Sequence, residues 1–144
     1  MIPKFRAWDK ENDRMIYPSN NDVYFNLTDD GISIEDLALE PYDGVFPLLD
    51  SVLMQSTGLN DKNGVEIFEG DVVKVNEDAG YSYITNVYWG GSDNYPAFDL
   101  NVEHIPTEWF YESNILSAIA SSGESETIEI IGNIYENPEL LNLR

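Results

Sequence analysis

The sequence contains no cysteine, one histidine and only seven Lys and Arg residues among 144. Without cysteine it can form neither a disulfide nor a thiolate metal site or nucleophile. His104 has no second histidine with which to hold a metal, and the GGSDN stretch at residues 90–94 lacks the G-x-S-x-G spacing of an exposed serine nucleophile. The phosphate-binding patterns G-x-x-x-x-G-K-S/T and G-x-G-x-x-G are absent as well. We therefore expect a protein that is not an enzyme and that has no catalytic residue, cofactor or metal.

Long hydrophobic runs are also missing. The first twelve residues, MIPKFRAWDKEN, carry five charged side chains and no apolar run of the length found in a signal peptide. No later segment comes near the roughly 18 consecutive apolar residues that indicate a membrane-spanning helix. We expect a soluble intracellular protein that does not bind membranes.

Acidic residues dominate the charge. Asp and Glu number 27, so the formal net charge at pH 7 is −20, and four of the seven basic residues lie within the first 14 residues. Binding to phosphates requires Lys and Arg to displace counterions, so this charge disfavours direct contact with nucleic acid. Two interpretations stay open. The carboxylates form a solvated surface, or they imitate DNA phosphates in an acidic decoy that binds a basic, nucleic-acid-binding protein.

The pattern of apolar residues predicts a mainly β protein. Hydrophobic residues make up 42% of the chain and aromatic residues 12%, which is enough for a core. Residues 32–39 and 113–120 fit either a short strand or a helical turn. Gly132 is expected at a bulge, and Pro138 at the start of a helical segment that packs on its own chain rather than on a neighbouring subunit. Period-two alternation and β-branched or aromatic runs predict strands at residues 4–8, 15–17, 23–28, 51–55, 65–68, 72–75, 81–89, 97–102 and 128–135.

The stretch DKNG at residues 61–64 is similar to part of a calcium-binding loop. With Gly64 at the sixth position of such a loop, Leu59 would occupy the first position and Gly70 the twelfth, so two essential carboxylates would be missing. The flanking segments also have the pattern of strands rather than helices. We interpret Asn63-Gly64 as a tight turn with two positive φ values, followed by a second turn at Gly70-Asp71.

Aromatic residues gather in or beside the two central loops of the second half. Trp89, Tyr95 and Trp109 are the candidates for contact with a partner, because exposed aromatic residues with polar neighbours are common anchors of protein interfaces. The alternative is that they belong to the core, as most large aromatic side chains do.

Three blocks of sequence, at both ends and in the middle, resemble the YopX family of bacteriophages and prophages. They are KFRAWD at residues 4–9, LMQSTGLNDKNGVEIFEGDVVKV at residues 53–75 and IEIIGNIYENPELL at residues 128–141. The resemblance implies a small SH3-like β-barrel with additional β-hairpins and short helical segments. It implies a single domain of residues 1–144, with an N-terminal β extension at residues 1–50 and a barrel core at residues 51–144.

The same resemblance implies a phage- or prophage-encoded protein that acts in the cytoplasm of a bacterial host cell and forms homo-oligomers. The family has no established activity, so no catalytic residues are carried over. These observations favour a non-enzymatic module that binds a host or phage protein, with the acidic decoy as the alternative. Binding through apolar contacts should tolerate moderate salt, whereas binding of a decoy should collapse as ionic strength rises.

Overall fold

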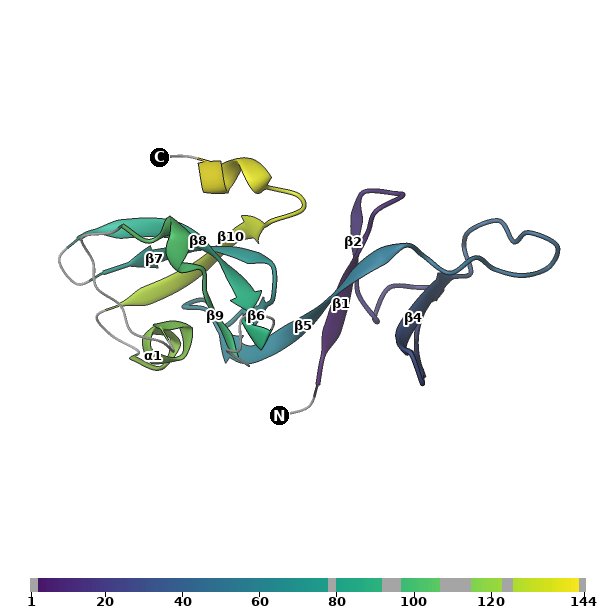
Figure 1. The fold of residues 1–144 in the computed structure, drawn as a ribbon, viewed down its shortest axis with the longest axis horizontal. Coiled ribbons are helices and arrows are strands. Elements are labelled where there is room, and N and C mark those ends of the chain that lie inside the picture. The colour runs from purple at the N-terminus through teal and green to yellow at the C-terminus, as the bar shows by residue number, and fades with distance from the viewer. Residues whose placement is uncertain (1–2, 78–79, 92–96, 107–114, 123–125, 143–144) are drawn as a thin grey trace. The chain divides into compact units, whose positions relative to one another are not determined.

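The structure is a computed structural model that describes residues 3–77, 80–91, 97–106, 115–122 and 126–142 (Figure 1). These residues form mainly antiparallel β-structure with short helices in the second half, which confirms the prediction of a mainly β protein. The chain divides into two compact units, an N-terminal unit of residues 2–55 and a C-terminal unit of residues 56–144. The single-domain organisation with a division at residue 50 stays a prediction.

The N-terminal unit consists of two β-hairpins and the first half of a long strand. Its strands are β1 (Phe5–Asp9), β2 (Arg14–Ile16), β3 (Val23–Thr28), β4 (Gly31–Asp36) and the first half of β5 (Ser51–Asn60). β1 pairs with β2 on one edge and with β5 on the other, whereas β3 and β4 form a separate two-stranded sheet. The alternating residues Ile32 and Ile34 pack with the core, so this part of the ambiguous segment at residues 32–39 is a strand.

Arg14 connects the two sheets of the N-terminal unit. Its Nε donates to Asp9 Oδ2 at 3.0 Å and its Nη2 donates to Asp36 Oδ2 at 2.7 Å, and both carboxylates are buried. Burial raises the pKa of Asp9, but hydrogen bonds from Asn12, Arg14 and the backbone N–H groups of Glu11 and Asn12 together lower the pKa below its usual value. The hydrogen bond to Asp36 is the main cause that raises the pKa of Arg14. This network lies beside the apolar cluster of Ala7, Ile16, Val23 and Ile34.

The described residues of the C-terminal unit form a curled antiparallel β-structure with one α-helix. Its remaining elements are β6 (Glu66–Phe68), β7 (Asp71–Asn76), β8 (Ser82–Trp89), β9 (Phe98–Leu100), the 3-10 helix η2 (Val102–His104), α1 (Ile115–Ser122), β10 (Thr127–Asn133) and the 3-10 helix η3 (Pro138–Asn142). Four strands form a sheet in the order β10-β7-β8-β9, and the second half of β5 pairs with β6. β5 continues to Asn60, five residues beyond the predicted end, and the strand predicted at residues 97–102 ends at Leu100 because Asn101 caps η2.

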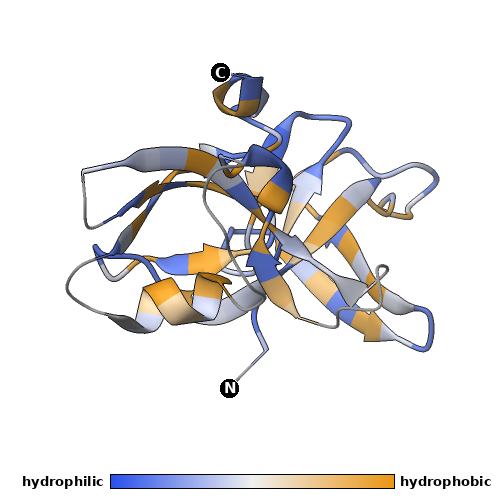
Figure 2. Cartoon of the chain, turned by 60° about the vertical axis from the view of Figure 1, so that its left-hand side comes forward, coloured by the Kyte–Doolittle hydropathy of each residue, from blue (hydrophilic) through white to orange (hydrophobic). Residues whose placement is uncertain are grey.

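The core of the C-terminal unit lies between this sheet and α1. The strands carry both hydrophobic and hydrophilic residues (Figure 2), and α1 contacts both β9 and β10. The described part of the ambiguous segment at residues 113–120 is therefore a helix. The helix buries Ile115, Leu116 and Ile119 in a cluster with residues of the sheet. η3 contacts β8 of the same chain, and none of its residues is buried, so the preference for packing on its own chain over docking on a neighbouring subunit stays a prediction.

The predicted bulge at Gly132 is present in β10. The register with β7 shifts between Ile130, which faces Val73, and Gly132, which faces Val72. A Cβ atom at Gly132 would lie 2.7 Å from Asn137 Cγ, much closer than such atoms can approach. Asn137 Oδ1 accepts a hydrogen bond from the backbone N–H of Asn133, the last residue of β10, at 3.2 Å. Because Gly132 has no side chain, the side chain of Asn137 has space to make this hydrogen bond.

Candidate functional site

The loop that joins β4 to β5 forms an arm, defined here as residues 38–48, which projects from the N-terminal unit (Figure 1). The chain is held at both ends of the arm, because Leu37 N–H donates to Asp22 O at 2.8 Å and Leu49 N–H donates to Ile34 O at 2.8 Å. An isolated β-bridge between Glu35 and Leu48 adds to the second of these attachments. The arm therefore has a fixed base on the β3–β4 hairpin.

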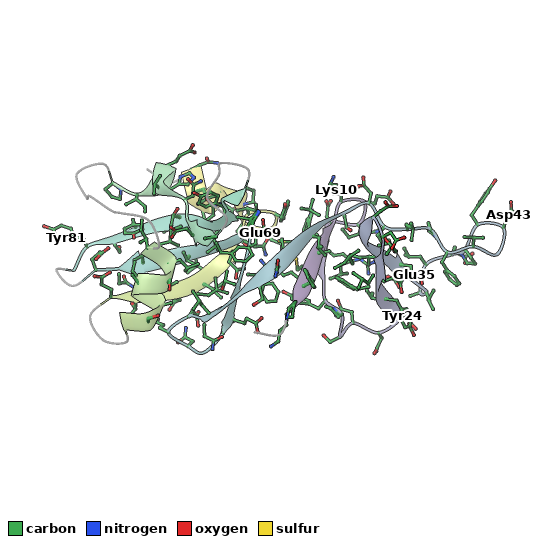
Figure 3. All side chains as sticks on the ribbon, turned by 60° about the horizontal axis from the view of Figure 1, so that its bottom comes forward. Lys10, Tyr24, Glu35, Asp43, Glu69 and Tyr81 are labelled. Atoms are coloured by element: carbon green, nitrogen blue, oxygen red, sulfur yellow. The ribbon has the colours of Figure 1, made fainter. Side chains whose placement is uncertain are left out.

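A two-residue turn forms the tip of the arm. Tyr42 and Val45 exchange two backbone hydrogen bonds of 2.9 Å each, and the residues between them have positive φ values, 49° at Asp43 and 77° at Gly44. Asp-Gly with two positive φ values is the combination that a tight type I′ hairpin requires. Figure 3 labels Asp43 at the outer end of the arm, and Tyr24 and Glu35 on the hairpin that supports it. The turn gives the tip a defined backbone conformation.

The tip presents apolar side chains to solvent. Tyr42 is 81% exposed, Val45 68% and Leu48 64%. Tyr42 and Val45 are directly opposite each other in the hairpin, so their side chains lie on the same face with Cβ atoms about 5.5 Å apart. Single exposed apolar residues are common on protein surfaces, but here three lie within seven residues on a supported turn, which makes the arm a candidate binding element.

The charges of the arm are all negative. Glu40 and Asp43 are exposed, and neither makes a hydrogen bond or an ion pair with the part of the chain that the structure describes. Asp50 follows the arm and interacts with Lys10 at 3.6 Å, with both side chains largely exposed. Two hydrated carboxylates, those of Glu40 and Asp43, therefore lie within five residues of Val45 in the sequence of the arm.

Of the three predicted contact residues, one lies in the described part of the chain. Trp89 is at the end of β8 and is 44% exposed, and its ring packs on Phe98 with ring centroids 5.0 Å apart. Tyr95 and Trp109 lie outside the described residues, so their role stays a prediction. None of the three predicted contact residues belongs to the arm. The signal that could have found it is Asp-Gly between Tyr42 and Val45.

The carboxylates of the DKNG stretch organise the backbone. Asp61 Oδ1 accepts hydrogen bonds from the N–H groups of Asn63 and Val65, both at 2.9 Å, and Oδ2 accepts one from Ile130 N–H at 3.0 Å. Only Gly64 has a positive φ value here, so the prediction of two positive values at Asn63-Gly64 is wrong. The side chain of Asp61 stabilises the turn, so that Asn63 does not need the left-handed conformation.

Two further buried carboxylates accept backbone hydrogen bonds in the C-terminal unit. Asp71 Oδ2 accepts one from Phe68 N–H at 2.8 Å. Asp99 Oδ1 accepts one from Leu100 N–H at 2.8 Å and one from Leu116 N–H, in the first turn of α1, at 2.9 Å. A carboxylate at this position is favoured by the free N–H groups and the dipole of a helix N-terminus. These acids have clear structural roles.

A cleft of about 240 Å³ lies between α1, the start of β10 and the end of β5. Asp61, at its edge, uses both carboxylate oxygens in the hydrogen bonds just described. Lys62, also at the edge, interacts through Nζ with Glu129 Oε2 at 3.0 Å. Glu126, the third charged residue of the lining, also has a partner within the chain. The charged groups that the cleft could offer a ligand are thus already engaged, which makes the arm the stronger candidate site.

The described ranges contain neither a candidate metal-binding cluster nor a candidate membrane-spanning helix. Within these ranges, no three His, Asp or Glu side chains are grouped so that they could hold a metal ion. No helix in the same ranges has the length and apolar character needed to cross a membrane.

Comparison with known proteins identifies the family. A family model described as YopX protein matches residues 4–142, and no curated protein matches the chain. The chain is similar to the crystal structure of protein EF1440 from Enterococcus faecalis, with 30% identity and a TM-score of 0.60 over 98% of this chain and 99% of that one. It also resembles the fold of protein YopX from Bacillus subtilis, with 23% identity and a TM-score of 0.55 over 94% of this chain and 95% of that one. Because the family model covers nearly the whole chain, this protein belongs to the YopX family.

Proposed function

We propose that the protein is a non-enzymatic protein-interaction module and that the arm at residues 38–48 is its contact element. The observation that carries the proposal is the pair of exposed side chains, Tyr42 and Val45, on one face of a turn whose base is fixed at both ends. A preorganised turn loses little conformational entropy on binding, and a tyrosine that fills a pocket is a frequent source of binding energy. Both properties favour recognition of a protein surface.

The structural use of the buried carboxylates supports a non-catalytic role. Asp61, Asp71 and Asp99 accept hydrogen bonds from backbone N–H groups of neighbouring elements, which is a sufficient reason for their burial. The proposal also includes features that rest on the resemblance to the YopX family. These are an SH3-like barrel in the C-terminal unit, an origin in a phage or prophage, action in the bacterial cytoplasm and self-association.

Photo-crosslinking from the arm tests this function. A photoreactive amino acid replaces Leu48, which is exposed on the arm but leaves the Tyr42–Val45 pair intact, and the protein is irradiated in a lysate of Enterococcus faecalis. The matched control carries the same group in place of Val102, which is 59% exposed in the C-terminal unit. We expect a discrete adduct from position 48 that is absent from position 102 and is lost when Tyr42 is changed to Ala.

Two outcomes of the crosslinking experiment would contradict the proposal. Equal adducts from positions 48 and 102, or an adduct that is unaffected by Tyr42→Ala, would mean that the arm is not the contact element. Because Tyr42 contributes little to the core, the variant should unfold at the same urea concentration as the original protein, and this measurement serves as the control for folding.

The acidic decoy is the second candidate function. It is favoured by the net charge of −20, much of it on exposed side chains such as Glu11, Asp22 and Glu136. A decoy would bind its partner through many carboxylates, so binding should be independent of Tyr42 and should weaken steeply between about 50 and 200 mM salt. Binding that depends on Tyr42 and survives at 200 mM salt would exclude this alternative.

A further inference from the structure

We infer that the arm recognises a partner surface in which an apolar pocket is edged by Lys or Arg, and that this surface does not belong to a second copy of the same chain. The inference rests on the proposed function and specifies the chemistry of the partner.

Two apolar side chains at the tip set the shape that the partner surface must have. Tyr42 and Val45 flank the turn and lie on the same face, and both are mostly exposed. A partner that buries them must offer a pocket wide enough for an aromatic ring and a neighbouring aliphatic side chain. The hydrogen-bonded turn fixes their spacing, so the pocket receives both side chains together or neither.

Asp43 lies between the two apolar residues in sequence, at the outer end of the arm. Its carboxylate makes no hydrogen bond or ion pair with any part of the chain that the structure describes. When Tyr42 and Val45 enter a pocket, Asp43 approaches the partner surface and loses part of its hydration. An unpaired carboxylate in that position would oppose binding strongly, whereas a Lys or Arg at the edge of the pocket would stabilise it.

The tip belongs to an acidic part of the chain. Residues 38–50 contain Glu40, Asp43 and Asp50 and no Lys or Arg. In the N-terminal unit, 11 acidic residues face 4 basic residues, a formal charge of −7, and the whole chain carries −20. Contact between the N-terminal units of two copies would therefore bring together surfaces of like net charge, which costs free energy, while a basic rim would be attracted from a distance.

The experiment uses the photoreactive group at position 48 in the lysate of Enterococcus faecalis and compares charge variants of the arm. Asp43→Asn removes the charge at the tip while keeping a residue that tolerates positive φ. The control Asp30→Asn removes an equal charge from the exposed β3–β4 turn in the same unit. Mass spectrometry then identifies the partner residues attached to position 48.

We expect Asp43→Asn to reduce the yield of adduct at least fivefold and Asp30→Asn to leave it within twofold, with Lys or Arg in the attached partner peptide. An adduct that is lost with Val45→Ala but unchanged with Asp43→Asn overturns the basic rim and leaves the proposed function in place. An adduct between two copies of this chain also overturns the inference, although the arm would remain a contact element. If neither Val45→Ala nor Asp43→Asn changes the adduct, both the inference and the proposed function fail.

Discussion

Changing Asp61 to Ala should destabilise the C-terminal unit more than any change at an exposed acid. The substitution removes three hydrogen bonds to one buried carboxylate, two within the turn and one to Ile130 in β10. A hydrogen bond to a charged group contributes about 1.5–3 kcal/mol. Water can replace the bonds to the exposed residues Asn63 and Val65 but reaches the half-buried Ile130 less easily. We therefore expect a loss of about 3 kcal/mol in the free energy of unfolding.

Comparing Asp61→Asn with Asp61→Ala separates the contributions of the two carboxylate oxygens. In Asp61→Asn, the side-chain oxygen can still accept from Asn63 and Val65, while the amide nitrogen faces the N–H donor of Ile130. This variant should lose about 1–2 kcal/mol. Glu136→Ala is the control, because Glu136 is exposed and keeps its backbone hydrogen bond to Asn133 Oδ1.

Urea unfolding followed by circular dichroism gives the free energies, and amide hydrogen exchange reports on the individual bonds. Asp61→Ala should speed exchange at Val65 and Ile130, and should lower the melting temperature by roughly 10–20 °C, as expected for a unit of this size. A loss within about 0.5 kcal/mol of the Glu136→Ala control would refute the argument. A large loss with unchanged exchange at Ile130 would show that the bond to β10 has no energetic importance.

Three further predictions follow from other parts of the structure. The pKa of Asp9 is lowered in the folded state, so its carboxylate should stabilise the protein fully above the unfolded-state pKa of about 3.9 and lose that contribution as the pH falls further. The difference in unfolding free energy between the original protein and Asp9→Asn should therefore shrink from pH 6 to pH 3. A difference that grows over this range would contradict the prediction. Gly132→Ala should cost about 1–3 kcal/mol in urea unfolding because its methyl group displaces the side chain of Asn137, and adding Asn137→Ala should cost less than the sum of the two single changes. Trp89→Ala should lower the free energy of unfolding, measured by thermal unfolding, by about 0.5–1.5 kcal/mol because the contact with Phe98 is removed. The yield of adduct from position 48 should not change. Loss of that adduct would instead show that Trp89 belongs to the binding site.

Much of the strand structure could be predicted from the sequence. Alternation with period two is a local property, so the hairpin of β1 and β2, the strand β3 and most of β8 are visible in the chain itself. Gly132 could be placed at a bulge because an isolated glycine inside a strand pattern has few other uses. The segment around residues 113–120 stayed ambiguous, since its short apolar run fits either period. Burial against β9 and β10 made its described part a helix.

The role of each carboxylate was decided by the tertiary structure. With 27 acids in the chain, no local pattern distinguishes Asp61 or Asp99, which are buried, from Asp43, which is exposed. The difference comes from partners distant in sequence: Asp61 accepts from Ile130, 69 residues away, and Asp99 from Leu116, 17 residues away. Asp36 likewise meets Arg14 across 22 residues.

The sequence by itself determined the mainly β class, the positions of most turns and the membership of the YopX family, because these depend on residue types at short spacing. The arm shows what the sequence could not determine. Its Asp-Gly turn is local and readable, but the exposure of Tyr42 and Val45 depends on whether any other part of the chain covers them. Burial is a property of long-range packing, and only the folded structure showed that this apolar pair faces solvent.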